Sequence, residues 1–329
     1  MKLICYGVRK VEVEFFKKLN KFGYELTLVE ELLNDTNIDL IEGHEAVMLR
    51  ANCPGNRENL MKMKDFGVKY LLTRTVGYNH IDLEAAKELG FKTARVPGYS
   101  PSAIAELAVS LAMMLVRRTG YMVSNARNKD FTVNEYMFAP EIRNLTIGII
   151  GTGKIGLTAA KIFKGMGSKV IAYDLYPNES AKNIVEYVSL ETLRDQADVI
   201  SLHCPYFKES NHHFINREFI NKMKDGSFIV NTARGELQDL DAIIEALESN
   251  KLCGYATDVL EKEKDYFFKN LNGKTLDDQM EKLVSLFPKA LITPHIGSYT
   301  DEALTNMVEI SYENLDEYLK TGTCGNKLF

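Results

Sequence analysis

The sequence predicts an α/β protein with two domains, each built around a parallel β-sheet. Short apolar runs alternate along the chain with amphipathic stretches of helical spacing, which is typical of β–α–β units. The 329 residues exceed the usual size of one domain. The alternation breaks at residues 96–101, VPGYSP, where two prolines and a glycine interrupt it. We therefore expect one domain of residues 1–100 plus 299–329 and a second of residues 101–298.

The N-terminal part contains short strand candidates separated by helical segments. Apolar residues recur at the spacing of one helix face in residues 11–22, and residues 56–66 form a second such segment. The expected strands are 2–8, 25–29, 46–49 and 70–73. A long apolar segment, residues 102–118, follows the proline-rich crossing. It contains Glu106 and ends at two arginines, so it is predicted to be a buried helix rather than a membrane span.

A second α/β series begins at residue 145. Its expected strands are 146–150, 169–174, 198–203, 227–233, 254–259 and 290–295. Its expected helices include 155–166, 216–223 and 240–249, and a C-terminal helix over 301–320 returns to the first domain. Six strands connected by helical crossovers are typical of a doubly wound, nucleotide-binding sheet.

The composition argues against several classes of protein. The net charge is −5 with 26% charged residues, and no basic stripe suggests a nucleic-acid or membrane partner. The N-terminus, MKLICYGVRK, suits a first strand better than a signal peptide. The five cysteines form no CxxC pair and are odd in number, which favours a reduced, cytoplasmic protein.

Residues 151–156 have the pattern GxGxxG between an apolar run and an amphipathic helix. Gly151 would permit a tight turn, Gly153 would let a pyrophosphate approach the backbone, and Gly156 would let the helix pack on the strand. The amides and dipole of the helix N-terminus favour phosphate there. Asp174 ends the next strand, where it would bind ribose hydroxyls and repel a 2′-phosphate. The pattern therefore predicts NAD rather than NADP.

Polar residues at the ends of later strands suit hydride transfer to a 2-oxoacid. Arg234 can grip a carboxylate and a carbonyl oxygen with its planar fork. His295 can protonate the new alkoxide, because imidazole titrates near working pH. A carboxylate beside this histidine would stabilise its protonated form. Glu263 and Asp258 are both available, and their spacing does not choose between them.

The adjacent His212 and His213 are the other histidines that invite a functional interpretation. Neighbouring side chains diverge on most backbones, and no carboxylate–histidine spacing of a metal motif surrounds them. No metal site is therefore expected.

At these motifs the chain resembles the D-2-hydroxyacid dehydrogenase family. The resemblance rests on YSPSAIAE at 99–106, GTGKIG at 151–156, NTARGEL at 231–237, the stretch 258–263 and TPHIG at 293–297. It implies two Rossmann-like or flavodoxin-like domains with an active-site cleft between them. It also implies a homodimer, formed through the helix after Pro101.

The resemblance assigns roles that spacing left open. Arg234, Glu263 and His295 correspond to the catalytic residues. The positions that correspond to substrate-binding residues are Arg9, Arg50, Val76, Gly77 and Tyr99. The positions that correspond to cofactor-binding residues are Gly151, Thr152, Gly153, Lys154, Ile155, Gly156, Asp174, Cys204, Pro205, Thr232, Ala233, Arg234, Asp258 and His295.

Four further segments resemble the (R)-2-hydroxyglutarate dehydrogenases within that family. They are CYGVR at 5–9, MLRANC at 48–53, TRTVG at 73–77 and GSYTDEAL at 297–304. A second arginine at position 50 would pair with the distal carboxylate of 2-oxoglutarate, which pyruvate lacks. The alternatives are a D-lactate dehydrogenase, a reductase of branched or aromatic 2-oxoacids and, more remotely, an NAD-sensing regulator.

Overall fold

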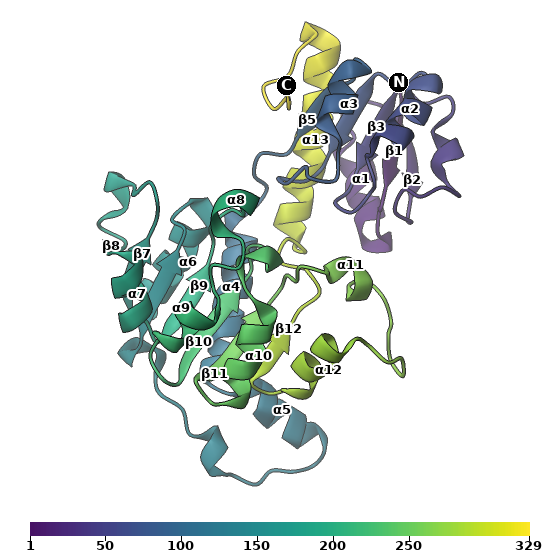
Figure 1. Ribbon diagram of the computed structural model, residues 1–329. Helices are drawn as coiled ribbons and strands as arrows, with labels where there is room; N and C mark the ends of the chain where they lie inside the picture. The colour runs from purple at the N-terminus through teal and green to yellow at the C-terminus, as the bar shows by residue number, and fades with distance from the viewer. The chain divides into compact units, whose positions relative to one another are not determined.

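The computed structural model describes residues 1–329 as two compact units (Figure 1). The first unit consists of Met1–Ser100 and Tyr299–Phe329, and the second of Pro101–Ser298. Each unit contains one sheet flanked by helices. The predicted α/β class with parallel sheets is confirmed.

The first unit is built on a five-stranded sheet in the order β2-β1-β3-β4-β5, with every neighbouring pair parallel. Its strands are β1 (Lys2–Tyr6), β2 (Glu25–Val29), β3 (Ala46–Leu49), β4 (Tyr70–Thr73) and β5 (Lys92–Arg95). Its helices are η1 (Lys10–Glu12), α1 (Val13–Leu19), η2 (Ile38–Ile41), α2 (Arg57–Asp65), α3 (Leu83–Glu88) and α13 (Asp301–Thr321). Parallel strands end at one sheet edge, which places the segments after β1, β3 and β4 there together.

The sheet of the first unit has a hydrophobic layer on each face because its side chains alternate. Ile4 and Tyr6 of β1 pack in one layer with side chains of α2 and α3. Leu3 and Cys5 pack in the other layer with Phe16 of α1 and the apolar face of α13. The C-terminal helix thus completes the core of the N-terminal unit, as its yellow ribbon beside α1 and β5 shows in Figure 1.

The second unit has a seven-stranded parallel sheet in the order β12-β11-β10-β9-β6-β7-β8. The strands are β6 (Thr146–Ile150), β7 (Lys169–Tyr173), β8 (Glu186–Tyr187), β9 (Val199–Leu202), β10 (Ser227–Asn231), β11 (Leu252–Thr257) and β12 (Ala290–Ile292). The strand order reverses between β6 and β9. In a doubly wound sheet, this reversal marks the crevice in which ligands bind.

Helices cover both faces of this second sheet. One face packs on α4 (Pro101–Val116) and α6 (Lys154–Gly165). The other packs on α7 (Leu190–Gln196), α9 (Arg217–Asn221), α10 (Leu240–Glu248) and α12 (Asp278–Ser285). The remaining helices are α5 (Thr119–Arg127), η3 (Glu135–Met137), η4 (Ile142–Asn144), η5 (Glu179–Ala181), α8 (Lys208–Asn211), η6 (Gly235–Leu237) and α11 (Glu263–Tyr266). None of the helices combines the length and apolar character needed to cross a bilayer.

Most predicted elements are present, and the differences have simple physical causes. All six strands predicted in the second unit exist, but β8 adds a two-residue edge strand that is too short to show a pattern. In the first unit, β5 was missed because only its two central residues are buried, and the flanking Lys92 and Arg95 leave no apolar run in the sequence. The helix predicted over residues 11–22 is divided into η1 and a shorter α1.

Candidate active site

Two glycines of the turn between β6 and α6 occupy positions where a side chain would not fit. Gly151 has a φ of +95°, and a Cβ there would lie 2.5 Å from the backbone nitrogen of Cys204. A Cβ on Gly156 would lie 1.9 Å from the carbonyl oxygen of Gly151. A Cβ on Gly153, by contrast, would meet no atom within 4 Å. The outer glycines are therefore required by the fold, and Gly153 leaves the backbone at the start of α6 open to a ligand.

Asp174, just after β7, holds the glycine turn that precedes α6. Its Oδ2 accepts hydrogen bonds from the backbone nitrogen of Thr152 at 2.6 Å and from the Thr152 hydroxyl at 2.9 Å. Its Oδ1 accepts one from the backbone nitrogen of Tyr176 at 2.9 Å. The sequence predicted only a ribose-binding role for Asp174, so its structural role in the turn was missed.

The carboxyl ends of neighbouring strands add further groups around the glycine turn. Burial raises the pKa of the Cys204 thiol to about 11, so this side chain is neutral beside Gly151. Thr232, after β10, has a buried hydroxyl with no hydrogen-bond partner. An open helix N-terminus, an acidic residue after β7 and an unused buried hydroxyl after β10 fit a dinucleotide.

His295 and Glu263 form a hydrogen-bonded pair in the second unit. The His295 Nδ1 lies 2.8 Å and 3.0 Å from the two carboxylate oxygens of Glu263. His295 follows β12 with a φ of +52°, and Glu263 begins α11. The pairing occupies Nδ1 and leaves Nε2 as the ring nitrogen available for proton transfer.

Asp258 holds the loop that carries His295. Its Oδ1 accepts from the Thr293 hydroxyl at 2.6 Å and from the Ile296 amide at 2.9 Å. Its Oδ2 accepts from the Gly297 amide at 2.8 Å. Burial raises the pKa of Asp258 above its ordinary value. The hydrogen bonds act in the opposite direction, but the effect of burial is larger. The two carboxylates that spacing left undecided therefore differ: Glu263 contacts the imidazole, and Asp258 contacts the loop.

Arg234 lies on a turn shaped by the buried side chain of Asn231, the last residue of β10. The Asn231 amide nitrogen donates to the carbonyl oxygen of Arg234 at 2.8 Å, and its oxygen accepts from the Ala233 amide at 2.9 Å. The Arg234 side chain is exposed, and its Nη1 donates to the Ala233 carbonyl at 2.6 Å. This turn presents a guanidinium group at the strand ends of the second sheet.

The first unit contains a buried cluster of cations around one carboxylate, Glu12. The Arg74 Nη2 lies 2.9 Å from Glu12 Oε2, and both side chains are almost fully buried. The Arg9 guanidinium lies 3.5 Å from Glu12 Oε1 and 4.2 Å from the centroid of the Tyr299 ring. Burial, and after it the charges of Arg9 and Arg74, lower the pKa of Arg50 to about 10. Glu12 thus pairs with two arginines, and the charge of a third, Arg50, lies close enough to feel all three groups.

The carbonyl groups of Val76 and Gly77, in the segment after β4, accept hydrogen bonds from other side chains of the protein. The Val76 carbonyl accepts from Arg95 at 2.9 Å, and the Gly77 carbonyl accepts from the Thr75 hydroxyl at 2.6 Å. The N–H groups of Val76 and Gly77 donate to no acceptor in the structure. Successive free amides of this kind suit an anion.

The sequence missed several residues that build these groups, and one of its arguments was wrong. Glu12 and Arg74 were missed because they pair across 62 positions of the chain. Asp258 was not expected to hold the His295 loop. The side chains of His212 and His213 do not diverge: their rings stack, with centroids 3.8 Å apart.

Comparisons with known proteins agree with this arrangement. Residues 109–297 match the family model "D-isomer specific 2-hydroxyacid dehydrogenase, NAD binding domain". The chain is 44% identical over 330 residues to an aromatic 2-oxoacid reductase of Clostridium sporogenes (strain ATCC 15579), covering 99% of each chain. It is 39% identical over 330 residues to the D-lactate dehydrogenase of Escherichia coli (strain K12), covering all of both.

A solved structure shows the same similarity in three dimensions. The NAD-complexed D-isomer specific 2-hydroxyacid dehydrogenase of Lactobacillus delbrueckii ssp. bulgaricus superposes with a TM-score of 0.85 at 33% identity, with all of both chains covered. The matches extend over both units and include the glycine turn and the loops that carry Arg234 and His295. The chain therefore belongs to the D-isomer specific 2-hydroxyacid dehydrogenase family.

Proposed function

We propose that the protein reversibly reduces 2-oxoglutarate to (R)-2-hydroxyglutarate with NADH. The observation behind the reaction is the hydrogen-bonded pair of His295 and Glu263 in the same unit as a dinucleotide-type glycine turn. The observation behind the substrate is the grouping of Arg9, Arg50 and Arg74 near Glu12 in the first unit. The stereochemistry is that of the family.

The chain's own residues would divide the work of the reaction. The bound dinucleotide supplies the hydride. Arg234 would bind the 2-oxoacid carboxylate and polarise the carbonyl oxygen with its planar fork. Protonated His295 would donate the proton on Nε2 to the oxygen as negative charge develops there. Glu263 would orient the ring and stabilise its positive charge through Nδ1.

The other predicted residues would hold the two ligands. The amides of Val76 and Gly77, with Tyr99 and Arg9, would position the substrate carboxylate. The residues that would hold NAD are Gly151, Thr152, Gly153, Lys154, Ile155, Gly156, Asp174, Cys204, Pro205, Thr232, Ala233 and Asp258.

Arg50 would bind the distal carboxylate of the substrate. It directly follows β3, and the positive charges of Arg9 and Arg74 repel its own positive charge. A dianionic 2-oxoacid would relieve this repulsion, whereas pyruvate brings only the one carboxylate that the reacting end requires. The same grouping of positive charges would disfavour a large uncharged side chain in place of that second carboxylate.

Reduction of an aromatic 2-oxoacid is the second candidate. A relative with 44% identity is named an aromatic 2-oxoacid reductase, and the Escherichia coli relative is named a D-lactate dehydrogenase. These names support a 2-oxoacid substrate generally. They make phenylpyruvate and pyruvate the comparisons that any substrate test must include.

A homodimer is the proposed assembly. The segment after Pro101 exposes apolar side chains beyond the end of α4, where Val123 is 69%, Phe131 is 78% and Phe138 is 88% exposed. Exposed apolar groups of this size are typical of an interface. Sedimentation velocity would test the assembly, and a monomer at micromolar concentration would contradict it.

Steady-state oxidation of NADH with a panel of 2-oxoacids tests the substrate. The panel is pyruvate, 2-oxoglutarate, oxaloacetate, 2-oxoisocaproate and phenylpyruvate. We expect the highest kcat/KM with 2-oxoglutarate. Arg50→Gln should lower that value by about 30-fold or more, as loss of one partner of a buried charge pair does, and should change the pyruvate value little. The matched control is Arg57→Gln, an exposed arginine at the start of α2.

Two results would contradict the substrate assignment. One is an equal loss for pyruvate and 2-oxoglutarate in Arg50→Gln. The other is a higher kcat/KM of the wild type with phenylpyruvate. Absence of NADH oxidation with every member of the panel would instead reject the proposed reaction.

A further inference from the structure

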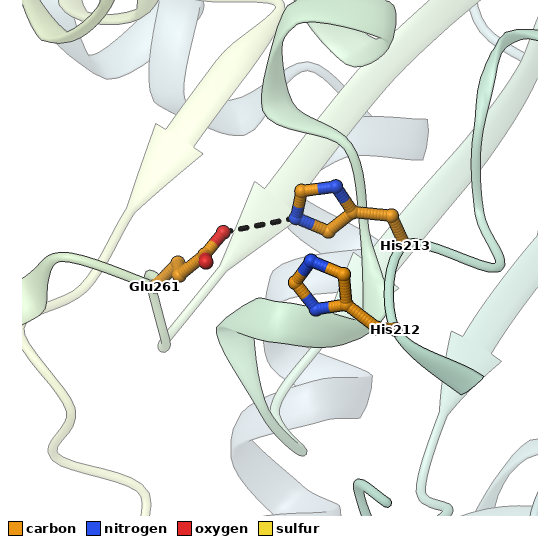
Figure 2. Close-up of side chains that lie close together, drawn as sticks. All are labelled: His212, His213 and Glu261. Atoms are coloured by element: carbon orange, nitrogen blue, oxygen red, sulfur yellow. Dashed lines mark hydrogen bonds and ion pairs between the residues drawn. The ribbon is translucent and has the colours of Figure 1, made fainter. Parts of the chain in front are cut away.

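Three potential metal ligands meet on the second unit, apart from the residues proposed for catalysis. They are His212 and His213, which follow α8, and Glu261, which lies between β11 and α11 (Figure 2). One ligand atom from each residue lies within 4.8 Å of the others. The His213 Nε2 is 2.9 Å from Glu261 Oε2, as the dashed line in Figure 2 shows.

The backbone at His213 brings the two imidazoles to the same side. His213 has a φ of +49°, in the left-handed region that few residues other than glycine adopt. Its N–H donates to the Glu236 carbonyl at 2.9 Å, which holds this conformation. The rings then stack with 20° between their planes, and both face Glu261 in Figure 2. Strained backbone of this kind is often associated with a functional site.

A neighbouring hydroxyl orients the outer imidazole. The Tyr206 hydroxyl lies 3.2 Å from His212 Nδ1. When Nδ1 donates its proton to this oxygen, Nε2 carries the free lone pair that a metal requires. Histidine ligands in proteins commonly have such a partner on their second ring nitrogen.

We propose that His212 Nε2, His213 Nε2 and the Glu261 carboxylate bind one divalent transition-metal ion, with Zn²⁺ the best match. Two imidazoles and one carboxylate are a ligand set that zinc accepts, with bond lengths of about 2.0–2.2 Å and tetrahedral geometry. Such bonds require ligand atoms roughly 3.4 Å apart. Separations of up to 4.8 Å must therefore close by as much as about 1.4 Å, and the two imidazoles must turn out of their stacked arrangement so that both lone pairs point at the ion. Rotation of these partly exposed side chains would allow both changes. Water would complete the coordination.

The ion would join segments that are distant in sequence. The 212–213 pair is bonded to η6 through Glu236, and a Cβ on Gly235 would lie 2.3 Å from the Glu261 backbone nitrogen. A metal bound to both histidines and to Glu261 would therefore fasten the segment after α8 to the segment between β11 and α11. Because the unfolded chain lacks this arrangement, binding should stabilise the folded protein.

Calorimetric titration of the chelator-treated, full-length protein with Zn²⁺ tests the site. We expect one ion per chain, and a rise in Tm of roughly 3–6 °C at a free Zn²⁺ concentration a hundredfold above Kd. His212→Gln, His213→Gln and Glu261→Gln should each weaken binding by about tenfold or more. His44→Gln, which changes a histidine of the first unit, should bind as the wild type does.

Two measurements keep the result unambiguous. Thermal melts without metal show whether each variant is folded, since the exposed His212 can be replaced with little effect on packing. Substitution with Co²⁺ distinguishes nitrogen and oxygen ligands from thiolates, because Cys204 and Cys253 are only partly buried. Absence of stoichiometric binding, a thiolate-to-cobalt band, or unchanged affinity in all three variants would each overturn the proposal.

Discussion

The imidazole of His295 faces both carboxylate oxygens of Glu263, with its Nδ1 2.8 Å from one and 3.0 Å from the other. A carboxylate in this position accepts the Nδ1 proton and fixes the tautomer and the ring orientation. Nε2 is then the nitrogen that can exchange a proton with a substrate. The left-handed backbone of His295 and the hydrogen bonds around Asp258 maintain this arrangement.

Replacement of Glu263 by Gln should lower turnover without loss of the fold. Glutamine keeps the size of the side chain but removes the charge that stabilises protonated His295, so we expect kcat to fall by roughly 10- to 100-fold. His295→Ala should cost more, about 10²- to 10⁴-fold. Fluorescence titration should show near-normal NADH binding in both variants.

The control for this pair is Asp265→Asn, which removes an exposed carboxylate from the same helix, α11. Its kcat should match that of the wild type. Near-normal turnover in His295→Ala would reject the histidine as the proton donor, whatever the behaviour of Glu263→Gln.

Replacement of Asp258 by Asn should destabilise the loop that carries His295. The two oxygens of Asp258 accept hydrogen bonds from three donors. Asparagine has an NH₂ group in place of one oxygen, and this donor would face an N–H or hydroxyl donor of the loop. We expect a loss of about 1–3 kcal/mol in the free energy of unfolding of the second unit. Calorimetry measures this loss.

The kinetic effect of Asp258→Asn should be a lower kcat, because the loop positions His295. Asp225→Asn is the matched control, since the Asp225 side chain is 90% exposed in its ion pair with Lys251. An unchanged Tm together with unchanged kcat would show that the buried carboxylate does not position the loop.

Replacement of Asp174 by Ala tests a residue with two roles. Loss of its charge should relax the preference for NADH over NADPH by about tenfold or more, because the repulsion of a 2′-phosphate disappears. Loss of the hydrogen bonds to Thr152 should also raise the KM for NADH. The ratio of kcat/KM for the two cofactors separates these effects, and an unchanged ratio would leave Asp174 with the structural role alone.

Local sequence patterns predicted the strands and the glycine turn because both depend on neighbouring residues. Within the turn, a Cβ on Gly156 would meet the carbonyl oxygen of Gly151, only five positions earlier in the chain. By contrast, the ion pair of Glu12 and Arg74 joins distant positions, and no local pattern marks it. The choice between Asp258 and Glu263 likewise depended on how one loop folds back toward Thr293 and His295, which spacing does not encode.

A single backbone angle explains why the adjacent histidines were misjudged. Side chains of neighbouring residues diverge on extended or helical backbone, and the φ of +49° at His213 removes that divergence. Nothing in the residue types near 212–213 requires a positive φ at a histidine. Conformations of this kind are set by tertiary contacts, here the hydrogen bond from the His213 amide to Glu236.

Acidification should destabilise the second unit through His203, which follows β9. Its Nε2 is 2.9 Å from the Ser201 hydroxyl, and its Nδ1 is buried without a partner. Burial lowers the pKa of His203 from 6.5 to about 4. Because the unfolded chain binds this proton more tightly, the contribution of neutral His203 is fully present above pH 6.5. It is lost as the pH falls toward 4, by up to roughly 3 kcal/mol.

His203→Gln, compared with the wild type in denaturant unfolding between pH 4 and pH 7.5, isolates this contribution. Glutamine cannot be protonated, so the variant does not lose this contribution at low pH. Between pH 7.5 and pH 4, the unfolding free energy of the wild type should therefore fall more than that of the variant. His44→Gln should follow the wild-type curve. His203 also lies close to the glycine turn, since its Cβ is 3.3 Å from where a Cβ on Gly156 would be. We therefore expect the NADH affinity of the wild type to fall over the same pH range as its stability. Parallel pH curves for wild type and His203→Gln would contradict the buried, neutral state of His203.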